Sequence, residues 1–341
     1  MVQAGDFSVY QCPATRKSLV QSDSGLSTEG GRTSYTLKDG VPNFLLSQCW
    51  QTPKSENLQL LLDVAKREGF KGAVDAVFED ARYVMDPSRA AYLSLLPIDK
   101  ETRVLEIGAS LGQHTRLIAA KSKRVAALEV IPEQALFTKL SCEQDGITNV
   151  SVSVGGDDCN LPYKDGMFDV VIMNYVLEWS AGRSRLSPKA SHQLIIKECC
   201  RVLRSGGILF LSTKNRFNVR LLLGALDEHV GFRFGNALPR WVMKLRTQAK
   251  QYSGTHGYLH SYGALRRIIS SSGFRHITPK LALPDARFPM VYSGFSKPEI
   301  TALRSDQKLL SANRLTRFLL TKVPGQFIRL IAPSLVFIAQ K

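Results

Sequence analysis

Acidic and glycine residues follow a short apolar run in RVLEIGASLGQHT, residues 103–115. Glu106 stands near the end of the run, and Gly108, Ser110 and Gly112 follow at every second position. Glycine permits a sharp turn and lets a ligand approach the backbone closely. A carboxylate at a strand end attracts a cationic group, whereas a nicotinamide-dinucleotide fingerprint has glycine at that position. The stretch therefore predicts a site for a ligand that carries an ammonium group.

Two further acids follow the next apolar runs. Glu129 lies at the end of RVAALEV, and Asp157 follows NVSVSV. A carboxylate at the first place can accept hydrogen bonds from both hydroxyls of a ribose, and one at the second place can accept from the amino group of adenine. We interpret the neighbouring Asp158 as a solvated residue. The three acids together predict a ligand with a nucleoside part.

Alternating strands and helices must position these acids. Apolar runs predict strands, and amphipathic patterns predict helices between them. The strands are expected at 104–107, 124–130, 149–154, 168–177 and 206–213, and the helices at about 113–121, 132–146 and 189–203. This alternation indicates an α/β fold with a doubly wound, mostly parallel sheet. Ligands of such sheets bind outside the carboxyl ends of the strands.

Residues 103–213 resemble the class I S-adenosylmethionine-dependent methyltransferases, of the methyltransferase type 11 group. The first motif of that family, acid-x-Gly-x-Gly-x-Gly, reads EIGASLG here, with Ser110 in place of the middle glycine. NYVLEW, residues 174–179, is similar to the segment that lines the methyl-transfer site. VLRSGGILFLST is similar to the turn before the fifth strand, with Ser205 in place of a proline.

The resemblance implies a seven-stranded Rossmann-like methyltransferase sheet and S-adenosyl-L-methionine as the cofactor. It implies methyl transfer as the activity, and it implies a set of cofactor-binding residues. These residues are Glu106, Gly108, Ser110, Gly112, Glu129, Asp157 and Asn174.

Residues 7–46 resemble the small zinc-ribbon module that precedes some methyltransferases, including an rRNA guanine methyltransferase. Cys12-Pro13 is present, but Thr15 stands where the module has its next cysteine. The second metal-binding pair is missing, and Cys49 is too isolated to replace it. We therefore expect a degenerate, metal-free module.

The sequence divides into four predicted parts. Residues 1–50 form the degenerate zinc-ribbon-like segment, 51–98 a helical lead-in, 99–214 the S-adenosylmethionine-binding core, and 215–341 a substrate-binding or cap region. The last part includes two more strands of the core sheet, at 275–283 and 334–340, with a helical insert between them at about 298–331.

Positive charge is concentrated in the last part of the chain. Residues 216–341 contain 20 Lys and Arg against 5 Asp and Glu, whereas residues 1–215 contain 25 against 24, and the whole chain has a net charge of +16. Segregated charge indicates the kind of partner more than it indicates solubility. We expect a small-molecule or glycan acceptor that is anionic or presented on an anionic surface, with Arg233, Arg240, Lys244 and Arg246 contributing to its attraction.

Histidines in the same part are the candidate catalytic bases. Transfer of a methyl group to oxygen or nitrogen requires removal of a proton from the acceptor, which a histidine can accept. The candidates are His229 in ALDEHVGF and His256 and His260 in GTHGYLHSY. Structural roles for each of them stay open.

Three functions compete. The first is O-methylation of a small molecule, sugar, glycolipid or secondary metabolite. The second is methylation of rRNA or tRNA, which the zinc-ribbon-like segment and the basic region favour. Against it, the basic region lacks the interleaved aromatic residues of an RNA module, and Asn174-Tyr175-Val176-Leu177 replaces the Asn/Asp-Pro-Pro-aromatic motif of N-methylases. The third is a non-catalytic methyltransferase-like binding protein.

The sequence also bears on location. No apolar run approaches the ~18 residues that a membrane span needs, although peripheral contact with a membrane stays open. MVQAGDFSVYQ at the start lacks the basic and apolar regions of a secretion signal, and the six cysteines show no C-x-x-C spacing. Free thiols in a reducing compartment are the better interpretation. We expect a cytoplasmic protein.

Overall fold

The computed structural model describes residues 7–22, 25–46, 55–77, 86–180, 186–226, 233–234, 238–239, 242 and 257–341. The chain forms two compact units. Unit 1 comprises Met1–Met173, Lys197–Leu209 and Lys341, and unit 2 comprises Asn174–Ile196 and Phe210–Gln340. Strand β9 (Leu203–Lys214) begins in unit 1 and ends in unit 2.

The central sheet of unit 1 contains the parallel strands that the sequence predicts. Its strands are β5 (Arg103–Ile107), β6 (Arg124–Glu129), β7 (Val150–Val154) and β8 (Phe168–Asn174). The order is β9-β8-β5-β6-β7, and β5 pairs in parallel with both β6 and β8. Because these strands are nearly continuous apolar runs, they suit burial on both faces. Their carboxyl ends carry the acids of the candidate site.

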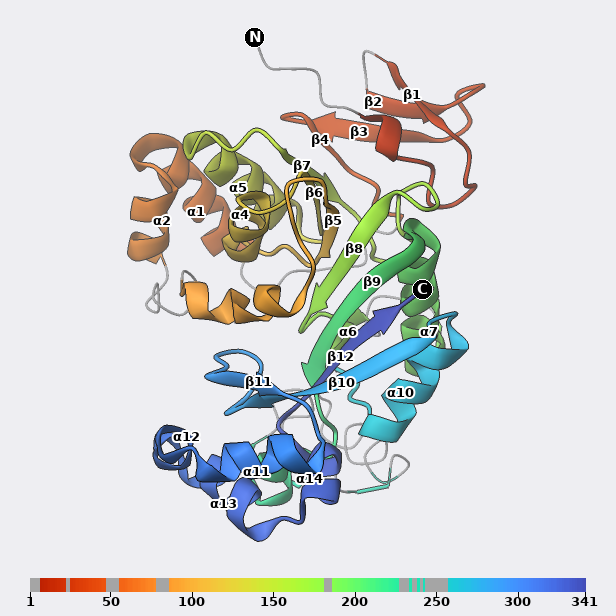
Figure 1. Ribbon diagram of the computed structural model, residues 1–341. Coiled ribbons are helices and arrows are strands. Elements are labelled where there is room, and N and C mark those ends of the chain that lie inside the picture. Colours follow the sequence, from red (N-terminus) through yellow and green to blue (C-terminus); the bar gives the residue numbers. More distant parts are fainter. Residues whose placement is uncertain are drawn as a thin grey trace. The chain divides into compact units, whose positions relative to one another are not determined.

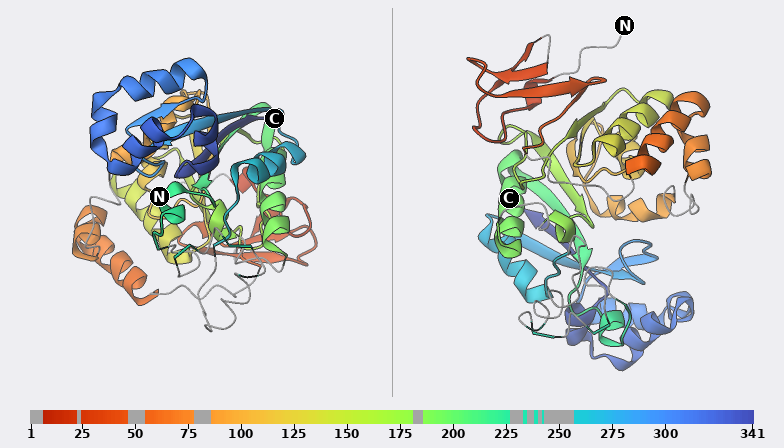
Figure 2. Two further views of the ribbon diagram at one scale, coloured as in Figure 1. Left: turned by 90° about the horizontal axis from the view of Figure 1, so that it is seen from below. Right: turned by 180° about the vertical axis from the view of Figure 1, so that it is seen from behind.

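A group of helices lies beside this sheet in unit 1 (Figure 1). They are α1 (Ser55–Glu68), α2 (Phe70–Val77), the 3-10 helix η2 (Pro87–Leu95), α4 (Gln113–Ala119) and α5 (Pro132–Gln144). α5 packs on β6 and β7, and the α1–α2 pair packs against α5 (Figure 2). Their shared apolar cluster includes Leu61, Phe70 and Phe137.

A small antiparallel sheet forms the N-terminal module of unit 1. Its elements are η1 (Phe7–Val9), β1 (Leu19–Ser22), β2 (Gly25–Thr28), β3 (Ser34–Lys38) and β4 (Val41–Pro42), in the order β1-β2-β3-β4. Cys12 Sγ lies 3.0 Å from the hydroxyl of Tyr35. In the part of the chain that the structure describes, no group of three or more His, Cys, Asp or Glu residues is placed to hold a metal ion.

Unit 2 contains an antiparallel sheet and a group of helices. Its strands are β10 (His276–Leu283), β11 (Val291–Ser293) and β12 (Ser334–Gln340), in the order β11-β10-β12-β9. Its helices are α6 (Leu177–Ser180), α8 (Val219–Leu222), α10 (Tyr262–Ser271), α11 (Lys297–Ser305), α12 (Gln307–Ala312), α13 (Arg314–Lys322) and α14 (Gly325–Ile331), with most of α7 (Pro188–Val202). The helices α11–α14 share one buried apolar cluster with β10.

The predicted α/β fold with a mostly parallel sheet is confirmed, with two differences of detail. The sheet has eight strands rather than seven, because Val291–Ser293 pairs with the outer edge of β10. The strand expected at 168–177 ends at Asn174, because Tyr175 adopts a left-handed conformation with φ 58°. Within the described residues, no helix is both long and apolar enough to cross a membrane.

Candidate active site

The turn between β5 and α4 has the backbone that the glycine pattern predicts. Gly108, Ser110 and Gly112 all have positive φ, at 78°, 52° and 75°. Gly112 precedes the first residue of α4, and a side chain there would lie 2.9 Å from Cγ2 of Thr138. Residues other than glycine rarely adopt this conformation, so the positive φ of Ser110 is unusual for its residue type. The small or absent side chains thus let the turn pack closely against α5.

Substitution of Gly112 by alanine tests this turn. A left-handed non-glycine residue costs about 1–2 kcal/mol, and the contact with Thr138 adds overpacking. Gly146→Ala is the matched control, because Gly146 also has positive φ, at 68°, but no atom lies within 4 Å of the added group. We expect Gly112→Ala to lower the free energy of unfolding by about 1 kcal/mol more than the control. Equal losses in urea unfolding would contradict the close approach.

Glu106 is a buried carboxyl group at the end of β5. Its side chain accepts a hydrogen bond from Thr115 Oγ1 at 2.6 Å, and the residue is 4% exposed. Burial raises the pKa of Glu106 to about 8, and the charge of Glu129 adds to the increase. The hydrogen bond from Thr115 opposes it. A cation placed against Glu106 would stabilise its ionised form.

Glu129 is a buried carboxylate at the end of β6, and it binds main-chain amides. Oε2 accepts from the amide of Ser110 at 2.8 Å, and Oε1 accepts from the amides of Val130 and Ile131 at 2.8 and 3.1 Å. A carboxylate has about four lone-pair positions, so about one is left for a ribose hydroxyl. Glu129 therefore joins the glycine turn to the neighbouring strand.

Asp157 follows β7 and contacts the N-terminal module. Its Oδ1 accepts from the amide of Leu46 at 3.3 Å, and the amide of Phe44 donates to the carbonyl oxygen of Val154 at 2.8 Å. Tyr10 of the module packs on Phe44, with ring centroids 5.1 Å apart. The module thus lies against the loop that carries the acid expected to bind adenine.

These residues fit S-adenosylmethionine. Burial and the charge of Glu129 raise the free-energy cost of ionising Glu106, and a cationic amino-acid group beside it would lower that cost. The turn of Gly108 to Gly112 has the positive-φ backbone that glycine permits, and glycine carries no side chain to keep a ligand from the main chain. No phosphate group is needed to explain this set of donors and acceptors.

His114 is a buried residue of this region that the sequence analysis did not select. Its Nδ1 lies 3.3 Å from the hydroxyl of Tyr92, and among the described residues its Nε2 has no hydrogen-bond partner. Burial, together with the charge of Arg89, lowers the pKa of His114 to about 3, so the ring is neutral at pH 7. The one feature of the sequence that could have identified His114 is its position just after the glycine turn.

The segment after β8 belongs to unit 2 and forms its own hydrogen-bonded cluster. Ser212 donates to the side chain of Asn174 through Oγ, and its carbonyl oxygen accepts from the amide of Tyr175 at 2.9 Å. Glu178 is buried, and its carboxyl group accepts from Thr213 Oγ1 at 2.6 Å. Burial raises the pKa of Glu178. Chemically, this group is a proton acceptor that the sequence analysis did not identify.

One of the three candidate histidines lies in the described part of the chain. His229 and His256 fall outside the described residues. His260 is buried, and its Nε2 lies 2.7 Å from Nδ1 of His192. The ring of Tyr258 lies 5.0 Å from that of His260. His260 would have to break its contact with His192 before Nε2 could accept a proton, so its catalytic role stays a prediction.

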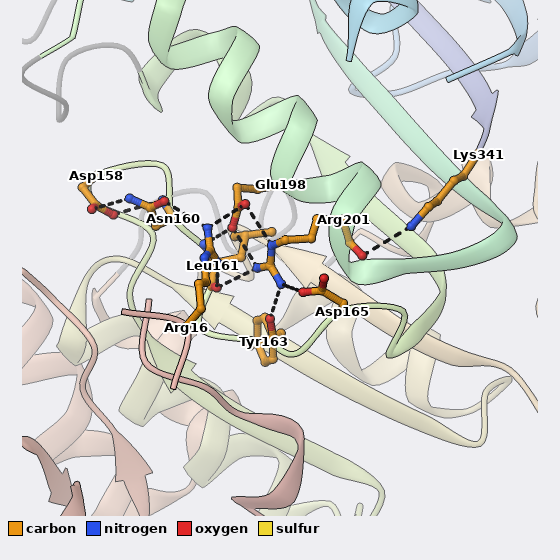
Figure 3. A network of polar contacts seen from close by, with 9 residues as sticks. All are labelled: Arg16, Asp158, Asn160, Leu161, Tyr163, Asp165, Glu198, Arg201 and Lys341. Atoms are coloured by element: carbon orange, nitrogen blue, oxygen red, sulfur yellow. Dashed lines mark hydrogen bonds and ion pairs between the residues drawn. The ribbon is translucent and has the colours of Figure 1, made fainter. Parts of the chain in front are cut away.

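A polar network holds the loop that follows Asp157 (Figure 3). Arg201 donates to both carboxylate oxygens of Glu198, at 2.9 and 2.8 Å, and to the carbonyl oxygen of Tyr163 at 2.7 Å. Arg16 of the N-terminal module lies 2.7 Å from the same carboxylate. The amide of Leu161 donates to Glu198 Oε2 at 3.1 Å. One buried carboxylate thus connects the module, the loop and helix α7.

The sequence matches known methyltransferases. Residues 105–211 match the family model of the methyltransferase domain. A malonyl-acyl-carrier-protein O-methyltransferase of Methylococcus capsulatus is 27% identical over 216 residues, which are 63% of this chain and 64% of that protein. A ubiquinone biosynthesis O-methyltransferase of Xanthomonas axonopodis pv. citri is 29% identical over 185 residues, which are 50% of this chain and 73% of that protein.

The bifunctional biotin biosynthesis protein BioHC of Cellvibrio japonicus is 26% identical over 159 residues, 46% of this chain and 29% of that protein. The chain therefore matches less than two thirds of the length of the Methylococcus and Cellvibrio proteins. The crystal structure of an S-adenosylmethionine-dependent methyltransferase of Mesorhizobium loti aligns with a TM-score of 0.47 and 13% identity, over 74% of this chain and 96% of that one.

Proposed function

Because the chain carries an S-adenosylmethionine-dependent methyltransferase domain at residues 105–211, we propose that the protein methylates an oxygen atom of a small-molecule acceptor. The acceptor class is a small molecule, sugar, glycolipid or secondary metabolite. The observation that carries the proposal is a set of three buried carboxylates at the carboxyl ends of adjacent parallel strands. They are Glu106 in β5, Glu129 at the end of β6 and Asp157 after β7.

The residues of the chain have defined tasks in this proposal. S-adenosylmethionine supplies a methyl group that its positively charged sulfur makes electrophilic. Glu106 binds the cationic amino-acid part, Glu129 a ribose hydroxyl and Asp157 the adenine amino group. The glycine turn lets the ligand approach the backbone. The protein's main contribution is then alignment of the acceptor with the methyl group.

Oxygen as the acceptor atom is supported by the relatives. The Methylococcus and Xanthomonas proteins are both named as O-methyltransferases, one of malonyl-acyl-carrier protein and one of ubiquinone biosynthesis. Their names differ in substrate, so they support the type of reaction rather than one acceptor.

An assay with methyl-labelled S-adenosylmethionine tests the proposed function. The purified protein is incubated with a panel of hydroxylated small molecules, sugars and glycolipids, and with tRNA and rRNA as a separate arm. We expect mass spectrometry to find label in a small-molecule product, and NMR to place the new methyl group on oxygen. Label only in RNA, or only on nitrogen or carbon, would overturn the proposal.

Glu129→Ala tests the cofactor assignment. A hydrogen bond to a charged group contributes about 1.5–3 kcal/mol, so calorimetry should show roughly ten- to a hundredfold weaker binding of S-adenosylmethionine. Glu143→Ala is the control, because Glu143 lies at the far end of α5 with its side chain 52% exposed. Thermal unfolding of both variants checks that the fold persists. Unchanged affinity in a folded Glu129→Ala protein would refute the assignment.

A further inference from the structure

Unit 2 contains a cavity beside the segment that follows β8. Its volume is about 170 Å³. This is room for one small anionic group with a few attached atoms, and it is less than the ~300–1,000 Å³ of sites that enclose a whole drug-sized ligand. The polar and charged residues that line it include Tyr175, Lys214, Asn218, Arg220, Asp285 and Arg287.

Positive charge dominates the lining of this cavity. Lys214, Arg220 and Arg287 provide three cations, and Asp285 provides one carboxylate. They come from separate elements: Lys214 ends β9, Arg220 lies on α8, and Arg287 follows β10. Guanidinium groups bind phosphate and carboxylate through paired hydrogen bonds. The lining therefore suits an anionic oxygen group.

The position of Arg287 is fixed by its surroundings. Asp285 Oδ1 accepts from the amide of Arg287 at 2.8 Å, which closes a tight turn after β10. The guanidinium group of Arg287 lies 5.5 Å from the centroid of the Tyr175 ring. Cations are attracted to the face of an aromatic ring at this distance. Arg287 is thus held before any ligand arrives, which lowers the entropic cost of binding.

Tyr175 lines the cavity from the segment after β8. It directly follows the last residue of β8, Asn174. Its hydroxyl lies 2.5 Å from Ser334 Oγ, and Ser334 Oγ accepts from the amide of Ala286 at 3.1 Å. Its positive φ of 58° is a strained conformation for a tyrosine. Strained conformations of this kind cluster at active sites and ligand-binding sites.

Apolar residues complete the cavity. Leu221, Ala225 and Leu226 line it together with the charged groups. Leu226 also pairs through an isolated bridge with Arg233, one of the four basic residues expected to attract the acceptor. The cavity therefore combines cationic groups that suit an anion with a few apolar contacts for the atoms attached to it.

We propose that this cavity binds a phosphate or carboxylate group of the methyl acceptor, with Arg287, Arg220 and Lys214 as its recognition groups. The inference rests on the proposed methyltransferase function and names the acceptor class for it. Asp285 sets the position of Arg287 through the main chain, while its charge weakens binding of the anion.

Titration of two probes tests the inference. Inorganic phosphate and succinate are each titrated into the whole protein at low ionic strength, and binding is followed by NMR. In Arg287→Gln, affinity for the bound probe should fall roughly tenfold or more, because a charge-assisted paired contact is lost. In Asp285→Asn, which keeps the turn but removes the negative charge, affinity should rise roughly three- to tenfold.

Arg317→Gln is the matched control, because Arg317 is an exposed arginine of α13 in the same unit. Its affinity for the probes should equal that of the wild type. Binding of phosphate alone would indicate a phosphorylated acceptor, and binding of succinate alone a carboxylated one. Absence of binding for both probes would overturn the inference, as would equal affinities in Arg287→Gln, Asp285→Asn and the wild type.

A parallel titration of S-adenosylmethionine separates the two claims. All these variants should bind the cofactor with wild-type affinity. Cofactor binding without anion binding would refute the acceptor site in this cavity, while the proposed methyltransferase function would still stand. Anion binding without cofactor binding would refute the proposed function, and the role of the cavity as an acceptor site with it.

Discussion

Replacement of Glu106 by glutamine is expected to weaken binding of S-adenosylmethionine at least a hundredfold and to stabilise the ligand-free protein at pH 8. The first effect follows because a buried carboxylate that pairs with a cation contributes several times more than a neutral hydrogen bond. Calorimetry at pH 8 measures it, since Glu106 is then about half ionised in the free protein.

The second effect follows from the pKa of Glu106, which burial raises from 4.5 to about 8. The folded state holds the proton more tightly, so the wild type loses stability as the pH rises from about 4.5 to 8. Each unit of pKa shift corresponds to ~1.4 kcal/mol, so the total loss is a few kcal/mol. Glutamine is neutral throughout, and its carbonyl oxygen can still accept from Thr115.

Thermal unfolding at pH 5 and pH 8 measures this difference. Glu106→Gln should unfold close to the wild type at pH 5 and at a clearly higher temperature at pH 8. Glu101→Gln is the control, because the Glu101 side chain is 81% exposed. The same difference between Glu106→Gln and wild type at both pH values would contradict the buried, protonated carboxyl group.

Replacement of Arg201 by methionine is expected to cost about 3 kcal/mol of unfolding free energy, the lower end of what a broken buried ion pair costs. The Arg201 and Glu198 side chains are 17% and 6% exposed, so the remaining carboxylate stays poorly hydrated. Arg16 still contacts Glu198, which limits the loss. Arg204→Met is the control: Arg204 pairs with Asp169 with its side chain 52% exposed, and such pairs contribute at most about 1 kcal/mol.

The stability that the Glu198–Arg201 pair contributes depends on pH with a sign opposite to that of Glu106. Burial alone would raise the pKa of Glu198, but the hydrogen bonds and charge of Arg201 outweigh it and hold the pKa below 4.5. The stabilisation is therefore present above about pH 4.5 and is lost as the pH falls through the lowered pKa. Urea unfolding should show the full cost of Arg201→Met at pH 7 and a smaller cost near pH 3. A cost equal to that of Arg204→Met at pH 7 would refute the role of the network.

Local residue patterns were enough to predict the strands of the parallel sheet and the turn after β5. Buried parallel strands are nearly continuous apolar runs, so β5, β6 and β7 were found close to their observed bounds. Glycines at 108 and 112 predicted the positive-φ turn, because few other residues adopt that backbone. The candidate cofactor acids Glu106 and Glu129 follow from the same local patterns.

Contacts between distant residues could not be predicted in this way. Arg16 and Glu198 are 182 positions apart, and no local pattern marks them as partners. Tyr175 and Arg287 are likewise brought together only by the fold of unit 2. The left-handed turn at Tyr175 was missed because its apolar neighbours continue the strand pattern of FDVVIMNYVL. The acceptor cavity therefore became apparent only from the structure.

Titration of S-adenosylmethionine into the purified chain tests the central claim most directly. Calorimetry should show one site per chain with micromolar affinity, and Glu106→Gln should remove the signal while the protein stays folded. A folded wild-type chain that releases no heat and shows no cofactor-induced rise in unfolding temperature would contradict the assignment.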